Sequence, residues 1–337
     1  MNRFFIIYSA ICISLTMGFD IKDDIWNKFI EFQNNFNKKY ETLEDLKYRY
    51  EIFSTNLHDI IAHNLNPYRN FSMNINKFAD ITSTEFKNNY IGGFKKLSKS
   101  SQSFGCKLFT SYPNKNDPEA IDWTEKNVVN AIRDQETCGS CWAFATTANA
   151  ESIWAISTGE LLDLSEQFLV DCATGIGYFN QGCNGGQPDS ALKYMINNGV
   201  CSEFVYPYTA TTDKCQKCSI NTDVKFTSCY DVTPNNELVL KAAVAQNPVV
   251  VAIEADTKYF QFYSSGVLTD SIKCGTNLDH AVEIIGYGKE NEIDYWKVRN
   301  SWGTSWGENG YVKIQRTSST NYTGVCGIAM EPSFIHL

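Results

Sequence analysis

The sequence predicts an α+β fold, with a helical half and a β half that face each other across a cleft, preceded by a separate helical segment. Residues 140–200 carry helical patterning. From about residue 245 on, the chain holds short β-branched or aromatic runs bounded by Gly, Asn or Pro, which are typical of strands. Helices followed by strands favour an α+β arrangement, and ligands commonly bind where two such halves meet.

The individual elements follow from local patterns. Ser140 is placed to cap a helix that runs from Cys141 to about Ile156. Two more helices are expected at 164–171 and 189–197, and strands are expected within 248–255, 280–288, 294–302 and 310–316.

The N-terminus has the layout of a secretory signal. Arg3 precedes an apolar run over 4–15, and the small residues Thr16 and Gly18 suit the positions before a cut. Residues 1–18 are therefore predicted to be removed in the secretory pathway. An uncleaved anchor is the weaker alternative because the run is too short to cross a bilayer, and no longer apolar run follows that predicts a membrane span.

Residues 19–117 form a polar first part. Helical periodicity is present over 24–40 and 46–64, and a Gly-, Ser- and Lys-rich stretch at 92–104 predicts an exposed linker that is open to proteolysis. Residues 118–337 form the second part and hold 10 of the 12 cysteines.

Charge and cysteine content narrow the function. The net charge of −9 argues against a nucleic-acid partner, which would require a basic face. With Cys12 in the predicted signal, an odd number of cysteines enters an oxidising compartment, where most are expected to form disulfides. At least one thiol is left over, and it is either an inert buried cysteine or a reactive one.

Cys138 and Cys141, three residues apart, allow several interpretations. A zinc site would need a second cysteine or histidine pair nearby, but Cys215 and Cys218 lie more than seventy residues on. A redox pair of the thioredoxin type would follow a strand in a βαβ unit, and none is evident. Both alternatives remain open but are weakly supported.

A nucleophile explains Cys141 better. The start of a helix favours a thiolate, and a nearby imidazole completes the usual activation. Of four histidines, His280 is the one in the body of the second part, at the start of an expected strand. Asn300 is in reach to orient the His280 ring, and Trp302 is in reach to shield the hydrogen bond between them. Gln135 is in reach to donate to an oxyanion, together with the Cys141 backbone N–H. Taken singly, each of these side chains is more often ordinary packing.

These residues resemble the papain family of cysteine proteases, in its cathepsin L-like branch, from 118 to 337. The "CGSCW" block fits, with His280 139 residues after Cys141 and Asn300 159 residues after it. The "GCNGG", "NSWG" and "SEQ-x-LVDC" blocks resemble the family as well. The resemblance implies a helical left half and an antiparallel β-barrel-like right half. It also implies an endopeptidase that works through a Cys141 thiolate, a His280 imidazolium and a thioester, with no cofactor and no metal.

The first part resembles the inhibitory propeptide of that family. One interleaved motif runs through Asp45, Arg49, Phe53, Asn56, Ile60 and Asn64, and a second through Asn74, Asn76, Phe78 and Asp80. The implied organisation is a signal at 1–18, a propeptide at 19–117 with its inhibitor domain at about 26–86, and a peptidase domain at 118–337. The propeptide would lie backwards along the cleft and be removed near residues 110–118.

The resemblance also sorts the cysteines. It implies the bridges Cys138–Cys183, Cys172–Cys215 and Cys274–Cys326, with an additional Cys201–Cys218 bridge. Cys229 is then expected as a buried free thiol and Cys106 as part of the removed segment.

Substrate preference is expected to depend on the pocket for the side chain two residues before the cut. The residues that the resemblance assigns to substrate binding are Gly185, Gly186, Gln187, Pro188, Ala252, Leu278, Asp279, Ala281, Trp302 and Glu331. Small and aliphatic walls suit Leu, Val or Phe, and Glu331 at the base suggests that Arg is also accepted. The alternative is that Glu331 is a solvated surface carboxylate.

Partners and compartment follow in outline. The protein is expected to be a monomer. Its expected partners are protein and peptide substrates, its own propeptide and cystatin-like inhibitors. Asn70 and Asn321 lie in glycosylation sequons. The expected destination is a lysosome or equivalent acidic vacuole, or the extracellular space. A non-catalytic binding homologue and a redox protein are the rival functions.

Overall fold

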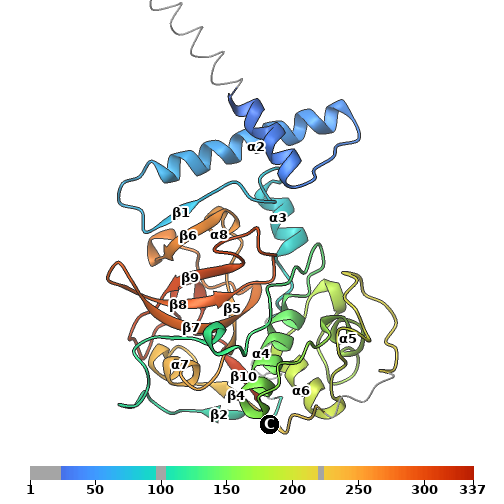
Figure 1. The fold of residues 1–337 in the computed structure, drawn as a ribbon, viewed down its shortest axis with the longest axis vertical. Helices are drawn as coiled ribbons and strands as arrows, with labels where there is room; N and C mark the ends of the chain where they lie inside the picture. Colours follow the sequence, from blue (N-terminus) through green and yellow to red (C-terminus); the bar gives the residue numbers. More distant parts are fainter. Residues whose placement is uncertain (1–23, 96–103, 219–223) are drawn as a thin grey trace, which may run out of the picture.

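The structure of the chain is a computed structural model that describes residues 24–95, 104–218 and 224–337 (Figure 1). The signal expected at 1–18 lies outside the described residues. Within these ranges, no helix is long and apolar enough to cross a membrane.

The first part forms a helical body at the top of Figure 1. Its elements are a helix over 24–35, α2 (Leu43–Asn64), β1 (Phe71–Met73) and α3 (Ser83–Tyr90). The Thr42 side chain caps α2, and the buried face of this helix carries Phe53, Leu57 and Ile60 at helical spacing. The two helices predicted from periodicity are therefore present.

Polar residues of the interleaved motif hold this body together. The Asn56 side chain donates to the carbonyls of Ala79 and Ile81 at 2.9 and 3.0 Å. The Asn64 side chain both donates to the Met73 carbonyl at 2.7 Å and accepts from its N–H at 3.0 Å. Each asparagine thus satisfies backbone groups of the segment that follows α2, those of Met73 lying at the end of β1.

The helical half of the second part packs around one buried helix. Its elements are α4 (Cys141–Thr158), α5 (Glu166–Cys172), the 3₁₀ turn η3 (Gly182–Asn184) and α6 (Pro188–Asn198). The three helices expected from the sequence are present. Ser140 occupies the N-cap position of α4, but its side chain makes no capping hydrogen bond, contrary to the expected cap.

The β half is a mostly antiparallel sheet. The remaining elements are β2 (Lys107–Phe109), β3 (Ile121–Asp122), η2 (Trp123–Lys126), β4 (Ser228–Val232), α7 (Glu237–Val244), β5 (Val249–Ile253), α8 (Lys258–Gln261), β6 (Tyr263–Leu268), η4 (Asp270–Ile272), β7 (His280–Glu290), β8 (Ile293–Arg299), β9 (Tyr311–Gln315), η5 (Val325–Gly327) and β10 (Ser333–His336). The described strands pair in the order β1-β6-β9-β8-β7-β5-β10-β4-β2, with β3 beside β7.

Burial explains the strand patterns. Strand β5 is buried at all five positions, and it is a continuous apolar run. Strand β9 alternates between buried and half-buried positions, as expected where one face of a sheet meets solvent. All four strand segments predicted from the sequence fall on β5, β7, β8 and β9.

Buried charged groups cross the junction between the two halves. Arg299 on β8 lies 4.0 Å from Glu151 on α4 and 3.8 Å from Glu283 on β7. All three are almost completely buried. Burial raises the pKa of both glutamates, that of Glu283 to about 8, while Arg299 acts in the opposite direction. Because separating such buried polar side chains is costly, this group favours one placement of α4 against the sheet.

The first part contributes strands to both ends of the sheet. Strand β1 pairs with β6, and β2 pairs in parallel with β4. In Figure 1, β2 lies at the bottom of the molecule, far from the helical body at the top. The segment that includes β2 therefore belongs structurally to the second part.

One cysteine expectation is wrong. Cys229 forms a disulfide with Cys106, whose Cα lies 4.6 Å away, because the pairing of β2 with β4 brings the two residues together. The other bonds are Cys138–Cys183, Cys172–Cys215, Cys201–Cys218 and Cys274–Cys326, as expected. Among the described cysteines, only Cys141 is free.

Candidate active site

Cys141 and His280 lie where the two halves meet. Cys141 is the first residue of α4, His280 is the first residue of β7, and these two elements pack together. Both side chains are fully buried. The Cys141 Sγ accepts a hydrogen bond from the Ala281 backbone N–H at 3.4 Å, so the thiol lies beside the start of the strand that carries His280.

Asn300 orients the imidazole. Its Oδ1 lies 2.8 Å from Nε2 of His280 and also accepts from the Ser301 N–H at 2.8 Å. Because this oxygen is an acceptor, Nε2 carries the proton of the neutral ring. The other ring nitrogen, Nδ1, has no hydrogen-bond partner among the described residues. An unprotonated Nδ1 is the form that a general base needs.

Trp302 covers this hydrogen-bonded pair. Its ring stacks on His280 with centroids 4.7 Å apart, and it is fully buried. The rings of Phe78 and Phe86, from the first part, pack against it in T-shaped arrangements with ring centroids 5.5 and 5.3 Å away. The His280 and Asn300 side chains are themselves buried, at 0% and 3% exposed.

Burial determines the protonation of the two reactive groups. It raises the pKa of the Cys141 thiol to about 12 and lowers the pKa of His280 to about 4, although the bond to Asn300 acts in the opposite direction on the imidazole. Both groups are therefore neutral while the first part covers them.

Gln135 lies at the same site. Its Oε1 accepts from the Ser301 hydroxyl at 2.6 Å, which fixes the side-chain amide. Its Nε2 donates to the carbonyl of Cys138 at 3.0 Å and to that of Tyr90 in the first part at 3.5 Å. The amide that is expected to bind an oxyanion thus faces a carbonyl of the propeptide.

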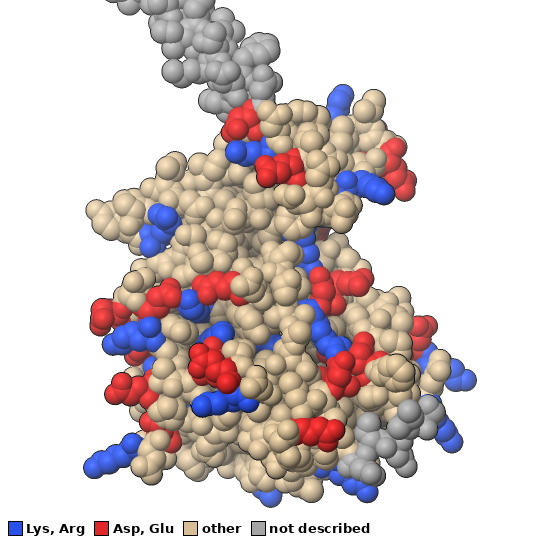
Figure 2. Space-filling view, viewed as in Figure 1, with Lys and Arg blue, Asp and Glu red and all other residues tan. Residues whose placement is uncertain are grey.

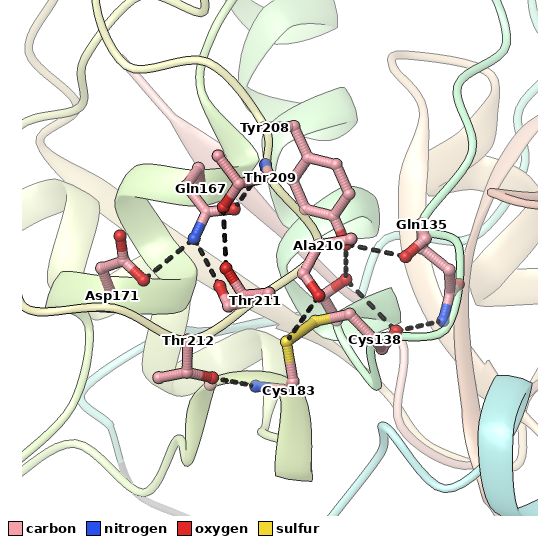
Figure 3. The surroundings of a disulfide bond; sticks show 12 residues. Gln135, Cys138, Gln167, Asp171, Cys183, Tyr208, Thr209, Ala210, Thr211 and Thr212 are labelled. Carbon is pink, nitrogen blue, oxygen red and sulfur yellow. Dashed lines mark hydrogen bonds between the residues drawn. A yellow bond between two sulfur atoms is a disulfide. The ribbon is translucent and has the colours of Figure 1, made fainter.

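Tyr208 is a site residue that the sequence did not reveal (Figure 3). Its hydroxyl donates to the Gln135 carbonyl at 2.8 Å and shares a 2.7 Å hydrogen bond with Ser140. The Ser140 hydroxyl therefore forms a hydrogen bond with Tyr208 instead of capping α4. No motif spacing signals this role, because Tyr208 lies 67 residues after Cys141.

The disulfide in Figure 3 anchors the same loop. Cys138 is bonded to Cys183, and the carbonyl of Cys183 accepts from the Gly139 N–H at 2.9 Å. The Thr212 hydroxyl accepts from the Cys183 N–H at 2.8 Å. Since Cys138 is held in this bond, it cannot serve as a zinc ligand or as the redox partner of Cys141.

Glu136 adopts a strained backbone conformation beside Gln135. Its φ of 53° lies in the left-handed region that favours glycine. A non-glycine residue there costs roughly 1–2 kcal/mol. Its N–H donates to the Asp134 side chain at 2.9 Å, which helps to hold this turn.

The first part of the chain passes directly over the thiol. A Cβ added at Gly93 would lie 2.6 Å from the Cys141 Sγ and 2.7 Å from the Gly139 carbonyl oxygen. Only glycine therefore allows the backbone to approach this closely.

Backbone hydrogen bonds hold the propeptide on both sides of the thiol. Phe94 forms a parallel bridge with Gly186, whose N–H donates to the Gly93 carbonyl at 2.7 Å. On the opposite side, the carbonyl of Asp279 accepts from the N–H groups of Gly92 and Phe94 at 3.0 and 3.3 Å. Gly186 and Asp279, two of the predicted substrate-binding residues, thus contact the propeptide backbone.

Phe94 packs among side chains that were predicted to line the substrate pocket. It clusters with Ala252, Leu278, Ala281 and Cys141, and only 5% of its surface is exposed. Three predicted wall residues thus meet around one aromatic side chain. Gln187 and Pro188 lie at the start of α6, directly after Gly185 and Gly186.

Asp189, Asp231 and Glu331 lie close enough to one another to interact electrostatically. The Gln187 side chain donates to Glu331 at 3.2 Å. Burial, followed by repulsion between neighbouring carboxylates, raises the pKa of Asp189 to about 7 and that of Asp231 to about 6. Within the described ranges, no group of three or more His, Cys, Asp or Glu side chains has the placement to hold a metal ion.

Comparison with known proteins identifies the family. Residues 117–336 match the papain family cysteine protease domain, and residues 29–86 match the cathepsin propeptide inhibitor domain. The germination-specific cysteine protease 1 of Arabidopsis thaliana is 44% identical over 305 residues, which span 88% of this chain and 80% of that protein.

Solved structures of precursors have the same fold. The proform of the ragweed pollen allergen Amb a 11, a cysteine protease, is 34% identical with a TM-score of 0.82, over 94% of this chain and 95% of its own. Digestive procathepsin L 3 of the Tenebrio molitor larval midgut is 35% identical with a TM-score of 0.83, over 93% and 99%. The chain therefore belongs to the papain family of cysteine proteases and carries the propeptide inhibitor domain of that family.

Proposed function

We propose that Cys141 and His280 form the catalytic pair of this cysteine endopeptidase, with Asn300 orienting the imidazole. The observation that carries the proposal is a free thiol at the start of α4 that accepts from the Ala281 N–H, next in sequence to His280, whose Nε2 lies 2.8 Å from the Asn300 Oδ1. Gln135 and the Cys141 backbone N–H are the proposed oxyanion donors.

The mechanism is acyl transfer. Cys141 transfers its proton to His280, and the thiolate attacks the carbonyl carbon of the scissile peptide bond. The oxyanion binds the Gln135 amide and the Cys141 N–H. His280 then protonates the leaving amine, which leaves a thioester on Cys141. Finally His280 takes a proton from water, the hydroxide attacks the thioester, and the acid product and the thiol are released.

The propeptide keeps this machinery inactive. Gly93 occupies the space above the Cys141 thiol, and the Tyr90 carbonyl accepts from the Gln135 amide. Because burial leaves the thiol and the imidazole neutral, the ion pair forms only after the propeptide leaves and the site is hydrated.

We further propose that the specificity pocket accepts apolar side chains and that it also accepts Arg. The packing of Phe94 against Ala252, Leu278 and Ala281 supports an apolar preference. Glu331 supplies a carboxylate for a guanidinium at the base of the pocket.

Cellular context is proposed from the same features. Papain-family proteases that are made with a propeptide and disulfides are typical of the secretory pathway. We propose an acidic vacuole of the lysosomal type or the extracellular space as the destination. Asn70 and Asn321 are exposed, as glycan acceptors need to be. Cystatin-like inhibitors are expected to bind the open cleft of the monomer.

Tyr208 is a positioning residue in this scheme. Its hydroxyl connects the main chain at Gln135 with Ser140, the residue before the nucleophile. It therefore sets the distance between the two proposed oxyanion donors without contacting the substrate.

Replacing Cys141 tests the catalytic assignment. Cys141→Ala is expected to give a folded precursor without peptidase activity, because no other described cysteine is a free thiol. Peptide hydrolysis and circular dichroism would be measured on the variant and on the parent chain. Hydrolysis by the purified variant at more than a trace of the parent rate would refute Cys141 as the nucleophile.

Tyr208→Phe tests the positioning role. Removal of one hydrogen bond is expected to lower kcat about fivefold with little change in KM, since the oxyanion donors act mainly in the transition state. Tyr178→Phe is the matched control, because its hydroxyl bonds to Asn197 and Asn198 on α6. An unchanged kcat, or a higher KM with an unchanged kcat, would show that Tyr208 does not position the oxyanion donors.

Glu331→Gln tests acceptance of Arg. The ratio of kcat/KM for Arg over Leu, two residues before the cut, is expected to fall on the order of tenfold through loss of a charged hydrogen bond. In the parent enzyme, this ratio should also fall as the pH decreases through about 7 to 6, because Asp189 and Asp231 become neutral. Glu292→Gln, at an exposed turn, is the control. An unchanged ratio would mean that Glu331 is a solvated surface carboxylate.

A further inference from the structure

The segment that carries Cys106 is built into the peptidase domain. Its strand β2 continues the sheet beyond β4, with Lys107 opposite Tyr230 and Phe109 opposite Val232. The Phe109 carbonyl accepts from both the N–H and the hydroxyl of Thr233, at 3.1 and 3.0 Å.

Side chains extend this attachment in both directions. Phe104 is buried against Phe179 in the helical half, with ring centroids 5.8 Å apart. The ring of Phe109 contacts Phe334 of β10 at 5.7 Å. Further along, the hydroxyl of Tyr112 accepts from the Asn236 side chain at 3.2 Å. The contacts therefore run over at least nine residues, although this stretch belongs to the predicted propeptide.

A covalent bond lies at the centre of these contacts. Cys229 on β4 is 3% exposed and bonded to Cys106, which is half-buried. The two residues are 123 positions apart in the chain. The cut expected near residues 110–118 lies after Cys106, so it breaks the main chain without separating the propeptide from the peptidase domain.

We propose that the Cys106–Cys229 disulfide keeps the propeptide attached to the peptidase domain after a cut at 110–118, and that a thiol reductant is needed to release it. The reductant donates two electrons and two protons to the sulfurs of Cys106 and Cys229. The disulfide becomes two thiols, and the reductant's own two thiols become a disulfide. Attack begins at Cys106, since its sulfur belongs to the more accessible residue of the bond.

The attachment maintains inhibition after the cut. A tethered inhibitor rebinds at an effective concentration in about the millimolar range, far above that of a free propeptide in dilute solution. The body at 24–95 therefore stays over Cys141, held by the β1–β6 pairing and by Gly93 in the cleft.

The first experiment measures the attachment itself. A recognition sequence for a specific protease is inserted after Lys115, an exposed position, in the Cys141→Ala precursor, and the precursor is cleaved. Under denaturing conditions without reductant, we expect a single species of the precursor mass plus one water. Addition of a dithiol should separate it into two chains.

The matched control is the double variant Cys106→Ser with Cys229→Ser, which should separate after cleavage without any reductant. Should this variant not fold, non-reducing peptide mapping of the unaltered precursor gives the same answer. A cross-linked Cys106–Cys229 peptide is expected. Separation of the parent chains without reductant, or two free thiols at these positions, would overturn the proposal.

A second experiment measures inhibition and rests on the proposed function. In the chain that retains Cys141, cleavage at the inserted site should leave peptidase activity low, and a dithiol should raise it on the order of tenfold or more. The double serine variant should be active after cleavage, and the same reductant should change its activity little. Equal responses of the two chains would overturn the inhibitory role. Absence of activity in both would count against the proposed function and leave the mass measurement as the test of the tether.

Discussion

The packing of α4 against the sheet places the Cys141 thiol beside the start of β7, which carries His280, and the rest of the site depends on this placement. Glu151, Glu283 and Arg299 span that junction as buried ionisable side chains, and this group favours one placement of the two halves. In that placement the Cys141 thiol meets the start of β7, and Trp302 excludes water from the imidazole. The reactive groups are thus positioned before any substrate arrives.

The same burial that builds the site also keeps it inactive. The propeptide lies over the thiol with a glycine where no other residue fits, and its backbone bonds to both rims of the cleft. Its aromatic side chains pack against Trp302, and Phe94 fills the apolar pocket. In the proposed mechanism, inhibition is both steric and electrostatic, because a desolvated thiol and imidazole both lose their charged forms.

Sequence patterns predicted those helices and strands that depend on residues close together in the chain. The helix that begins at Cys141, the strands of the β half and the two propeptide helices follow from local sequence patterns, although the expected Ser140 cap does not form. The Cys106–Cys229 bond could not be predicted, because it depends on a three-residue, largely exposed strand that pairs with a segment more than a hundred residues away. Tyr208 was missed for a related reason, since its role rests on bonds to a main-chain carbonyl and to Ser140 that no spacing encodes.

The most direct test of the central claim is the pH dependence of Cys141 alkylation by iodoacetamide, compared between the intact precursor and the processed enzyme. In the processed enzyme, hydration and a charged His280 should keep the thiol reactive well below its ordinary pKa of about 8.5. In the precursor, burial raises the pKa of Cys141 to about 12, so alkylation should be slow and increase only at alkaline pH. Coincident profiles for the two forms would contradict the account.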